Sequence, residues 1–216
     1  MDDFEPDVPG RSALCCLVAS PSGSAPAVKV GVLALQGAFA RHAAALGALG
    51  AEPIEVRAAP QIGEVDALVL PGGESTTMSM LLESSGLFDA IADQLRDGLP
   101  VLGTCAGMIL LGTEILDGRP DQRCFEAVDI SVRRNAFGRQ VDSFEADLDI
   151  DGLEGGPFRA VFIRAPFVER AGSGVEVLAT VDGHPVLCRQ GTTTVAAFHP
   201  ELSDDLRLHD RFLKEI

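Results

Sequence analysis

Apolar and polar positions alternate in one way before about residue 120 and in another way after it. In the first part, short continuous apolar runs are separated by longer stretches in which apolar residues recur at helical spacing. The runs predict buried strands at residues 28–35, 52–56, 67–70 and 101–102, and the stretches predict helices at 38–49, at 81–95 with a break near Ser85-Gly86, and after Gly107. This alternation predicts a parallel sheet covered by helices on both faces.

The second part consists of short strand candidates between Gly, Pro and Asp turns. They cover residues 128–132, 144–150, 160–163, 175–179, 185–189 and 193–198. Such a series suggests antiparallel additions to the sheet. The sequence shows no internal repeat and no interdomain linker. The predicted fold is therefore α/β, with three layers, a mostly parallel central sheet, helices on both faces and antiparallel additions.

The first 27 residues do not continue either pattern. An acidic leading segment with Asp2, Asp3, Glu5 and Asp7 is followed by a brief apolar stretch and then by a segment rich in Ser, Pro, Gly and Ala. A secretory signal needs a positively charged leading segment, so export is not expected. We expect residues 1–27 to be a flexible extension and residues 28–216 to form a single domain.

Composition narrows the range of partners and compartments. The formal net charge of −15 makes a poor binder of phosphate backbones, which argues against nucleic acid and anionic membrane surfaces as partners. The five cysteines are scattered without Cys-x-x-Cys spacing, so neither a disulfide framework nor a structural zinc site is expected. No apolar run approaches the roughly 18 residues of a membrane span. These features favour a cytoplasmic protein, and no metal or cofactor is expected.

One stretch carries the pattern of an exposed nucleophile. Gly103-Thr104-Cys105-Ala106-Gly107 follows a short apolar run and precedes an apolar helical one, a G-x-C-x-G version of the sharp turn between strand and helix. A side chain at either glycine would crowd so tight a turn. The start of the helix favours the thiolate of Cys105 over the thiol. The alternative is a small core cysteine beside two packing glycines.

A second glycine-containing stretch, Pro71 to Thr77, follows the predicted third strand. It should lie at the carboxyl edge of the sheet, where open α/β sheets bind ligands. Backbone N–H groups at Gly72-Gly73 could form an oxyanion hole together with the N–H of Ala106, and Ser75 is a plausible cap for the next helix. The lysine of a phosphate-binding loop is absent. A glycine-rich turn without a ligand is the alternative.

The candidate base is in Phe198-His199-Pro200-Glu201, where His199 lies 94 positions (199 − 105) after Cys105. If the backbone stays extended, Glu201 projects to the same side as His199 and can orient its ring, which gives a nucleophile, a base and an orienting carboxylate. An ordinary turn at a strand end is the alternative. The other histidines fit this role less well: His42 within a helix, His184 in a turn, and His209 in a polar C-terminal helix.

These three features together resemble class I glutamine amidotransferase domains, which are flavodoxin-like. Further segments resemble, more specifically, the family of glutaminase subunits of pyridoxal 5'-phosphate synthase. They are Leu35-Gln36-Gly37, Pro71 to Thr77, Gly103 to Met108, the block Arg134 to Glu145, Phe162-Ile163-Arg164-Ala165-Pro166, and His199-Pro200-Glu201-Leu202. The resemblance extends from about Val28 to the C-terminus, and no catalytic position departs from it.

The resemblance implies a hydrolase that converts L-glutamine to L-glutamate and ammonia through a glutamyl thioester. Cys105 would be the nucleophile, His199 the base and then the acid, and Glu201 the residue that orients it. Substrate binding would fall to Gly73, Glu74, Ser75, Arg134, Ile163 and Arg164, and the oxyanion hole to Gly73 and Ala106. The arginines suit this role chemically, because a guanidinium can hold a carboxylate by two hydrogen bonds. The alternative is that these arginines only form ordinary ion pairs at the surface.

The resemblance also implies a partner, a separate synthase (lyase) subunit that receives the ammonia for pyridoxal 5'-phosphate (vitamin B6) biosynthesis. Two other functions remain open from the sequence. One is a different cysteine hydrolase, or a chaperone, on a flavodoxin-like fold, which would not need the arginines or the late His-Pro-Glu. The other is a regulatory module without turnover, against which the intact Cys105, His199 and Glu201 argue.

Overall fold

The computed structural model describes residues 26–134 and 143–216. Two sequence-based predictions therefore fall wholly or partly outside the described residues. One is the flexible extension, of which only residues 26 and 27 are described. The other is the block of residues 134–145, of which residues 135–142 are not described.

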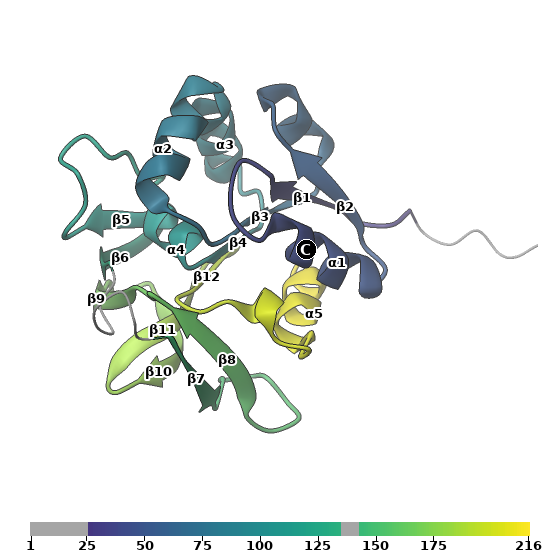
Figure 1. The fold of residues 1–216 in the computed structure, drawn as a ribbon. Coiled ribbons are helices and arrows are strands. Elements are labelled where there is room, and N and C mark those ends of the chain that lie inside the picture. Colours follow the sequence, from purple (N-terminus) through teal and green to yellow (C-terminus); the bar gives the residue numbers. More distant parts are fainter. Residues whose placement is uncertain (1–25, 135–142) are drawn as a thin grey trace, which may run out of the picture.

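A seven-stranded sheet forms the centre of the fold, in the order β10-β11-β12-β4-β3-β1-β2 (Figure 1). The strands are β1 Lys29–Leu33, β2 Glu52–Val56, β3 Ala67–Leu70, β4 Val101–Thr104, β10 Glu176–Val181, β11 His184–Gln190 and β12 Thr193–Ala196. The five from β12 to β2 pair in parallel, whereas β11 is antiparallel to both of its neighbours. The predicted parallel sheet with antiparallel additions is confirmed.

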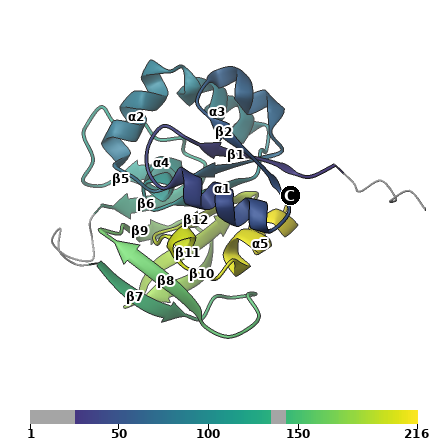
Figure 2. The same ribbon diagram turned by 45° about the vertical axis from the view of Figure 1, so that its right-hand side comes forward.

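Alternate residues of the central strands feed two hydrophobic clusters on opposite faces, as the period of two requires. Val30, Val32, Val69 and Leu102 pack with Leu46 and Phe212 of the helices α1 Phe39–Ala48 and α5 Arg207–Lys214. Leu68, Leu70 and Val101 belong to the larger cluster with α2 Ser75–Ser84, α3 Leu87–Arg96 and α4 Ala106–Leu111. Figures 1 and 2 show α1 and α5 together on one face and α2, α3 and α4 on the other. The three-layer prediction is confirmed.

The remaining strands form two small sheets of their own, so the prediction that residues 128–132, 144–150 and 160–163 add to the central sheet is wrong. β5 Gly112–Ile115 pairs in parallel with β6 Val128–Arg133, which pairs antiparallel with β9 Phe167–Ala171. β7 Ser143–Leu148 pairs antiparallel with β8 Phe158–Ile163. The apolar pattern did not reveal β5 and β9, since Gly-Thr-Glu-Ile and Phe-Val-Glu-Arg-Ala contain too few apolar positions to read as strands.

The helix predicted at residues 81–95 begins earlier than expected, at Ser75. The reason is Glu74, whose side chain accepts hydrogen bonds from the backbone N–H groups of Thr76 and Thr77 and so caps the helix. The predicted cap, Ser75, is instead its first residue. The break near Ser85-Gly86 is confirmed, because Gly86 takes a positive φ of 70° and separates α2 from α3.

Two 3₁₀ segments, Ala59–Glu64 (η1) and Pro200–Leu202 (η2), complete the described elements. None of the helices in the described part of the chain is long and apolar enough to cross a membrane.

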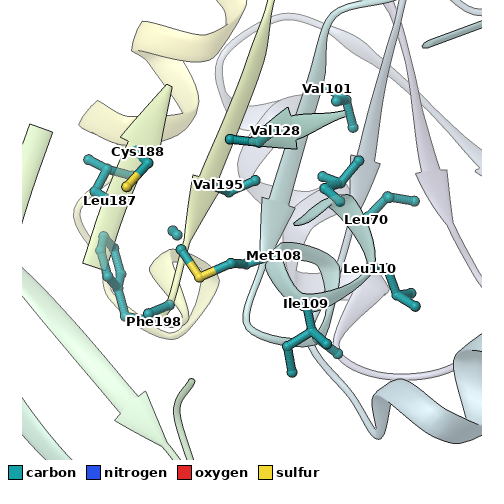
Figure 3. Close-up of a cluster of buried hydrophobic side chains, with 14 of the residues drawn as sticks. Leu70, Val101, Met108, Ile109, Leu110, Val128, Leu187, Cys188, Val195 and Phe198 are labelled. Atoms are coloured by element: carbon teal, nitrogen blue, oxygen red, sulfur yellow. The ribbon is translucent and has the colours of Figure 1, made fainter. Parts of the chain in front are cut away.

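The larger core cluster encloses α4, the helix that follows Cys105. All six residues of α4 are buried. Figure 3 shows Met108 of this helix among Val195 and Phe198 of the β12 region, with Leu187 and Cys188 of β11 nearby. The helix that follows the candidate nucleophile is therefore held inside the core, and its geometry is fixed by packing.

Candidate active site

Cys105 lies in a sharp turn between β4 and α4, as the sequence predicts. Its φ and ψ are 49° and −102°, which is unusual for a residue other than glycine. Its N–H donates a hydrogen bond to the carbonyl of Ala196 on the neighbouring strand β12, at 2.8 Å. Cys105 as a whole is only 7% exposed. The turn thus aims one small, nearly buried thiol at the carboxyl edge of the sheet.

Glycine at position 107 is required by contact and not only by flexibility. A Cβ on Gly107 would lie 2.1 Å from the carbonyl oxygen of Leu70 on β3. Backbone atoms cannot yield in the way that a flexible side chain can. The first turn of α4 therefore rests directly on the adjacent strand, which keeps Cys105 in place.

His199 reaches the same edge from β12. Its backbone N–H donates to the carbonyl of Val161 on β8 at 2.8 Å, and its ring Nδ1 lies 2.8 Å from Oε1 of Glu201. The expected pairing of His199 with Glu201 is present, although the backbone between them is not extended. Pro200 begins the 3₁₀ turn η2, in which the N–H of Leu202 donates to the carbonyl of His199 at 3.2 Å. Proline suits the first position of such a turn because it has no N–H to satisfy there.

Cys105 and His199 line one cavity of about 150 Å³. The other lining residues come from the β3–α2 loop, α4, the end of β6 and the end of β8: Gly73, Glu74, Ser75, Ile109, Arg134, Ile163 and Arg164. The structure thus brings together all the residues predicted for substrate binding. Glu201 lies behind His199, and Ala106 begins α4. Ile109 was missed, although its position one helical turn after Cys105 could have indicated it.

The glycine loop after β3 approaches both reactive side chains closely. A Cβ on Gly72 would lie 2.3 Å from Cε1 of His199 and 3.3 Å from Cβ of Cys105. Position 72 can therefore hold only a residue without a side chain. The backbone of the loop thus lies directly against the Cys–His pair.

Glu74 places a negative charge on the cavity wall. Burial on its own would raise the pKa of this carboxyl, but the hydrogen bonds from Thr77 and Thr76 outweigh it and lower the pKa to about 2. Arg134 donates to Glu74 Oε1 at 3.3 Å and to Thr76 Oγ1 at 3.1 Å. Arg134 is thus already engaged with the loop that it helps to shape.

Two polar groups of the cavity wall have no partner among the residues that the structure describes. Ser75 Oγ is buried and has no hydrogen-bond partner within the described residues. Arg164, which takes an unusual positive φ of 46°, makes no hydrogen bond or ion pair to any residue that the structure describes. A buried hydroxyl and an unengaged guanidinium beside a reactive thiol are suited to a polar ligand that carries a carboxylate.

Interactions within the Cys–His–Glu group shift the pKa values of His199 and Glu201. Burial would lower the pKa of His199, but hydrogen bonds and charge interactions with Cys105 and Glu201 raise it to about 10. Burial would raise the pKa of Glu201, but hydrogen bonds and charge interactions with His199 and His42 hold it well below its usual range. The ring of His199 can thus carry a proton while Glu201 stays ionised.

The other described cysteines differ from Cys105 in their surroundings. Burial raises the pKa of Cys188 to about 12, and burial also raises the pKa of Cys124. A thiol that stays protonated is a weak nucleophile. Within residues 26–134 and 143–216, no group of three or more His, Cys, Asp or Glu side chains is arranged to hold a metal ion.

The sequence reasoning also missed His42 and His209, which lie behind Glu201. His42 Nε2 is 3.2 Å from Glu201 Oε2, and His42 Nδ1 is 3.0 Å from His209 Nε2. Both histidines are fully buried. Their helical positions gave no signal, because a histidine in a helix has no pattern that separates a surface position from a buried contact.

Comparison with known proteins gives one consistent family. Residues 32–216 match the model of the SNO glutamine amidotransferase family. The chain is 56% identical to the pyridoxal 5'-phosphate synthase subunit PdxT of Nocardia farcinica over 90% of its length and 88% of the relative's. It is 59% identical to the protein of the same name from Mycobacteroides abscessus, over 85% of this chain and 95% of that one.

A solved structure described as a glutamine amidotransferase superimposes with a TM-score of 0.81 at 50% identity, over 86% of this chain and 97% of the other. A more distant structure, a glutamine amidotransferase from Thermotoga maritima, shares the fold with a TM-score of 0.57 at 14% identity, over 87% of this chain and 83% of the other. The chain belongs to the SNO glutamine amidotransferase family.

Proposed function

We propose that this protein hydrolyses the side-chain amide of L-glutamine to L-glutamate and ammonia. The observation that carries the proposal is the single cavity in which Cys105 and His199 meet a glycine loop and unengaged polar groups. Membership of a glutamine amidotransferase family supports the same substrate.

In the proposed reaction, the Cys105 thiolate attacks the amide carbon of glutamine and forms a carbon–sulfur bond. The carbon–nitrogen bond then breaks, and His199 gives the departing nitrogen the proton that it took from the thiol, which releases ammonia and leaves a glutamyl thioester. His199 next takes a proton from water as the water attacks the thioester, which yields glutamate and restores the thiol. Glu201 holds the ring in the tautomer that this transfer requires.

The oxyanion of each tetrahedral intermediate would be held by the backbone N–H groups of Gly73 and Ala106. Removing one such donor typically costs about 10²–10³ in rate. Gly72-Gly73 can rotate its peptide at little cost, because glycine tolerates both signs of φ. The loop is therefore well suited to be held in its productive orientation by a partner protein.

The two charged groups of the amino acid would be recognised on the cavity wall. Arg164 is suited to the α-carboxylate, since its guanidinium is unengaged among the described residues and Arg164 lines the cavity, and Arg134 supports the wall beside it. The ionised Glu74 is suited to the α-ammonium group. Ser75 and Ile163 complete this part of the site.

We also propose that the ammonia passes to a separate synthase subunit that makes pyridoxal 5'-phosphate. The relatives named as subunits of that synthase support this partner, since they match most of the chain at 53–59% identity. We place the reaction in the cytoplasm, because a thiol nucleophile functions in a reducing compartment and the described cysteines are free.

The test is a titration of the purified chain with its synthase, in which ammonia release from glutamine gives kcat and KM separately. We expect low turnover without the synthase and a rise in kcat on saturation. No ammonia at any synthase concentration would overturn the glutaminase assignment and leave a regulatory module or a different cysteine hydrolase. A kcat that is high from the start and does not rise would overturn only the gating by the partner.

A further inference from the structure

A line of buried polar side chains continues from the active site to the opposite face of the sheet. His199 Nδ1 contacts Glu201 Oε1 at 2.8 Å, and Glu201 Oε2 faces His42 Nε2 at 3.2 Å. His42 Nδ1 in turn contacts His209 Nε2 at 3.0 Å. The line crosses η2, α1 and α5, and it ends at His209 Nδ1, a buried atom without a hydrogen-bond partner among the described residues.

The central member of this line is an ionised carboxylate with no exposed side-chain surface. Such a charge is stable only if donors face both of its oxygens. His199 serves Oε1. Oε2 makes no well-aligned hydrogen bond within the described chain, and the group that faces it is His42 Nε2, whose only other polar contact there is Thr104 Oγ1 at 3.3 Å.

Two neutral tautomers of His42 fit the distances, but only one suits the carboxylate. With the proton on Nε2, His42 places an N–H donor 3.2 Å from Glu201 Oε2, and its bare Nδ1 can accept from His209 Nε2–H. With the proton on Nδ1, a lone pair would face the carboxylate oxygen at 3.2 Å, and the buried charge would lose its second donor. Burial and the neighbouring His42 lower the pKa of His209 to about 4, so His209 stays neutral and its Nε2–H can donate to His42 Nδ1.

We propose that His42 is a positioning residue for the glutaminase reaction. Its Nε2–H holds Glu201 Oε2, so that Oε1 stays directed at His199, and His209 fixes the tautomer of His42. This inference rests on the proposed function for its kinetic consequences, whereas its statement about the tautomer does not. The titratable groups of the line are His199, Glu201, His42 and His209, and Cys105 interacts with His199 at its active-site end.

The experiment compares His42→Leu, which removes the donor, with His42→Gln, whose amide nitrogen reaches the place of the ring Nε2. His209→Leu is compared with them, because it disturbs the same buried line one contact further from Glu201 and leaves the donor of His42 in place. All three are assayed as complexes with the synthase, after a check that each retains the melting transition of the wild-type chain.

We expect His42→Leu to lower kcat by about tenfold to a hundredfold with little change in KM, because the buried Glu201 charge loses one of the two donors that face it. His42→Gln should recover most of the rate, and His209→Leu should cause a smaller loss than His42→Leu. Equal losses in both His42 variants would mean that His42 only fills space, and would overturn the proposal.

A second measurement needs neither a substitution nor turnover. Nitrogen-15 NMR of the histidine-labelled chain reports the tautomer of each ring. We expect His42 with its proton on Nε2 and a bare Nδ1. A proton on Nδ1 with a bare Nε2 would overturn the inference, even if the glutaminase assignment stands. The expected tautomer in a chain that releases no ammonia would instead locate the failure in the proposed function.

Discussion

The two sides of the cavity hold their reactive groups by different means. Cys105 is held by shape, because Gly107 lets the first turn of α4 rest on the backbone of Leu70 and every residue of α4 is buried. His199 is held by polar contacts, through Glu201 to His42 and His209. On the first side, the turn rests on the neighbouring strand β3. The second side depends on elements far apart in the sequence, each of which contributes one donor or acceptor.

The difference matters for how each side should fail. Adding atoms to a position held by packing, such as Gly107, should lower the free energy of unfolding. Removing a hydrogen-bond donor from the polar side should first change the catalytic rate and the pH dependence of activity and stability. The following substitutions separate the two, beginning with the largest expected effect.

Cys105→Ala removes the proposed nucleophile from the side that is held by shape. Turnover should fall by about 10⁶, since the covalent route is lost, whereas the melting temperature should change little, because a small side chain is replaced by a smaller one. Ammonia release and thermal unfolding of the same sample measure both. Appreciable turnover by the folded variant would contradict the assignment of Cys105.

On the polar side, His199→Ala and Glu201→Gln should differ in size. His199→Ala removes the proton carrier and should cost about as much as loss of the nucleophile. Glu201→Gln keeps an acceptor for the ring but stabilises its charged form less, so the loss should be about 10⁴ or smaller. Steady-state kcat of the two variants in the complex gives the comparison, and equal losses would contradict this division of roles.

Gly107→Ala tests whether shape sets the turn. The added Cβ meets backbone of Leu70, so the free energy of unfolding should fall by about 3 kcal/mol. Gly47→Ala is the matched control, since Gly47 lies exposed in α1 and an added Cβ meets nothing within 4 Å. That change should raise stability by about 0.5–1 kcal/mol. Urea unfolding measures both, and a Gly107→Ala chain as stable as the wild type would show that the turn is not constrained by contact.

The polar side should also make stability depend on pH. The pKa of His209 falls from 6.5 to about 4 on folding, so the unfolded chain binds a proton more readily between these values. Stability should therefore decrease as the pH falls from 6.5 to 4, by an amount on the order of 3 kcal/mol. His209→Leu should flatten this slope, whatever its effect on absolute stability. If the His209→Leu chain lost stability with falling pH as steeply as the wild type in urea titrations between pH 6.5 and 4, His209 would not be the source of the acid sensitivity.

The same division explains what could be predicted from the sequence. Continuous apolar runs and the G-x-C-x-G turn encode their structure locally, and the central sheet and the turn at Cys105 follow the prediction. Ser75 was wrongly assigned as a cap because Glu74, one position earlier, has a longer side chain that reaches the same N–H groups. His42 and His209 could not be found, because their roles exist only where α1 and α5 pack together over Glu201.

The most direct test of the account is covalent labelling with a diazoketone analogue of glutamine, applied to the complex with the synthase and read by peptide mass. We predict one adduct, on Cys105, that excess L-glutamine suppresses, with Cys124 and Cys188 unmodified. Loss of glutaminase activity with Cys105 unmodified, or labelling of Cys105 that glutamine does not suppress, would contradict it.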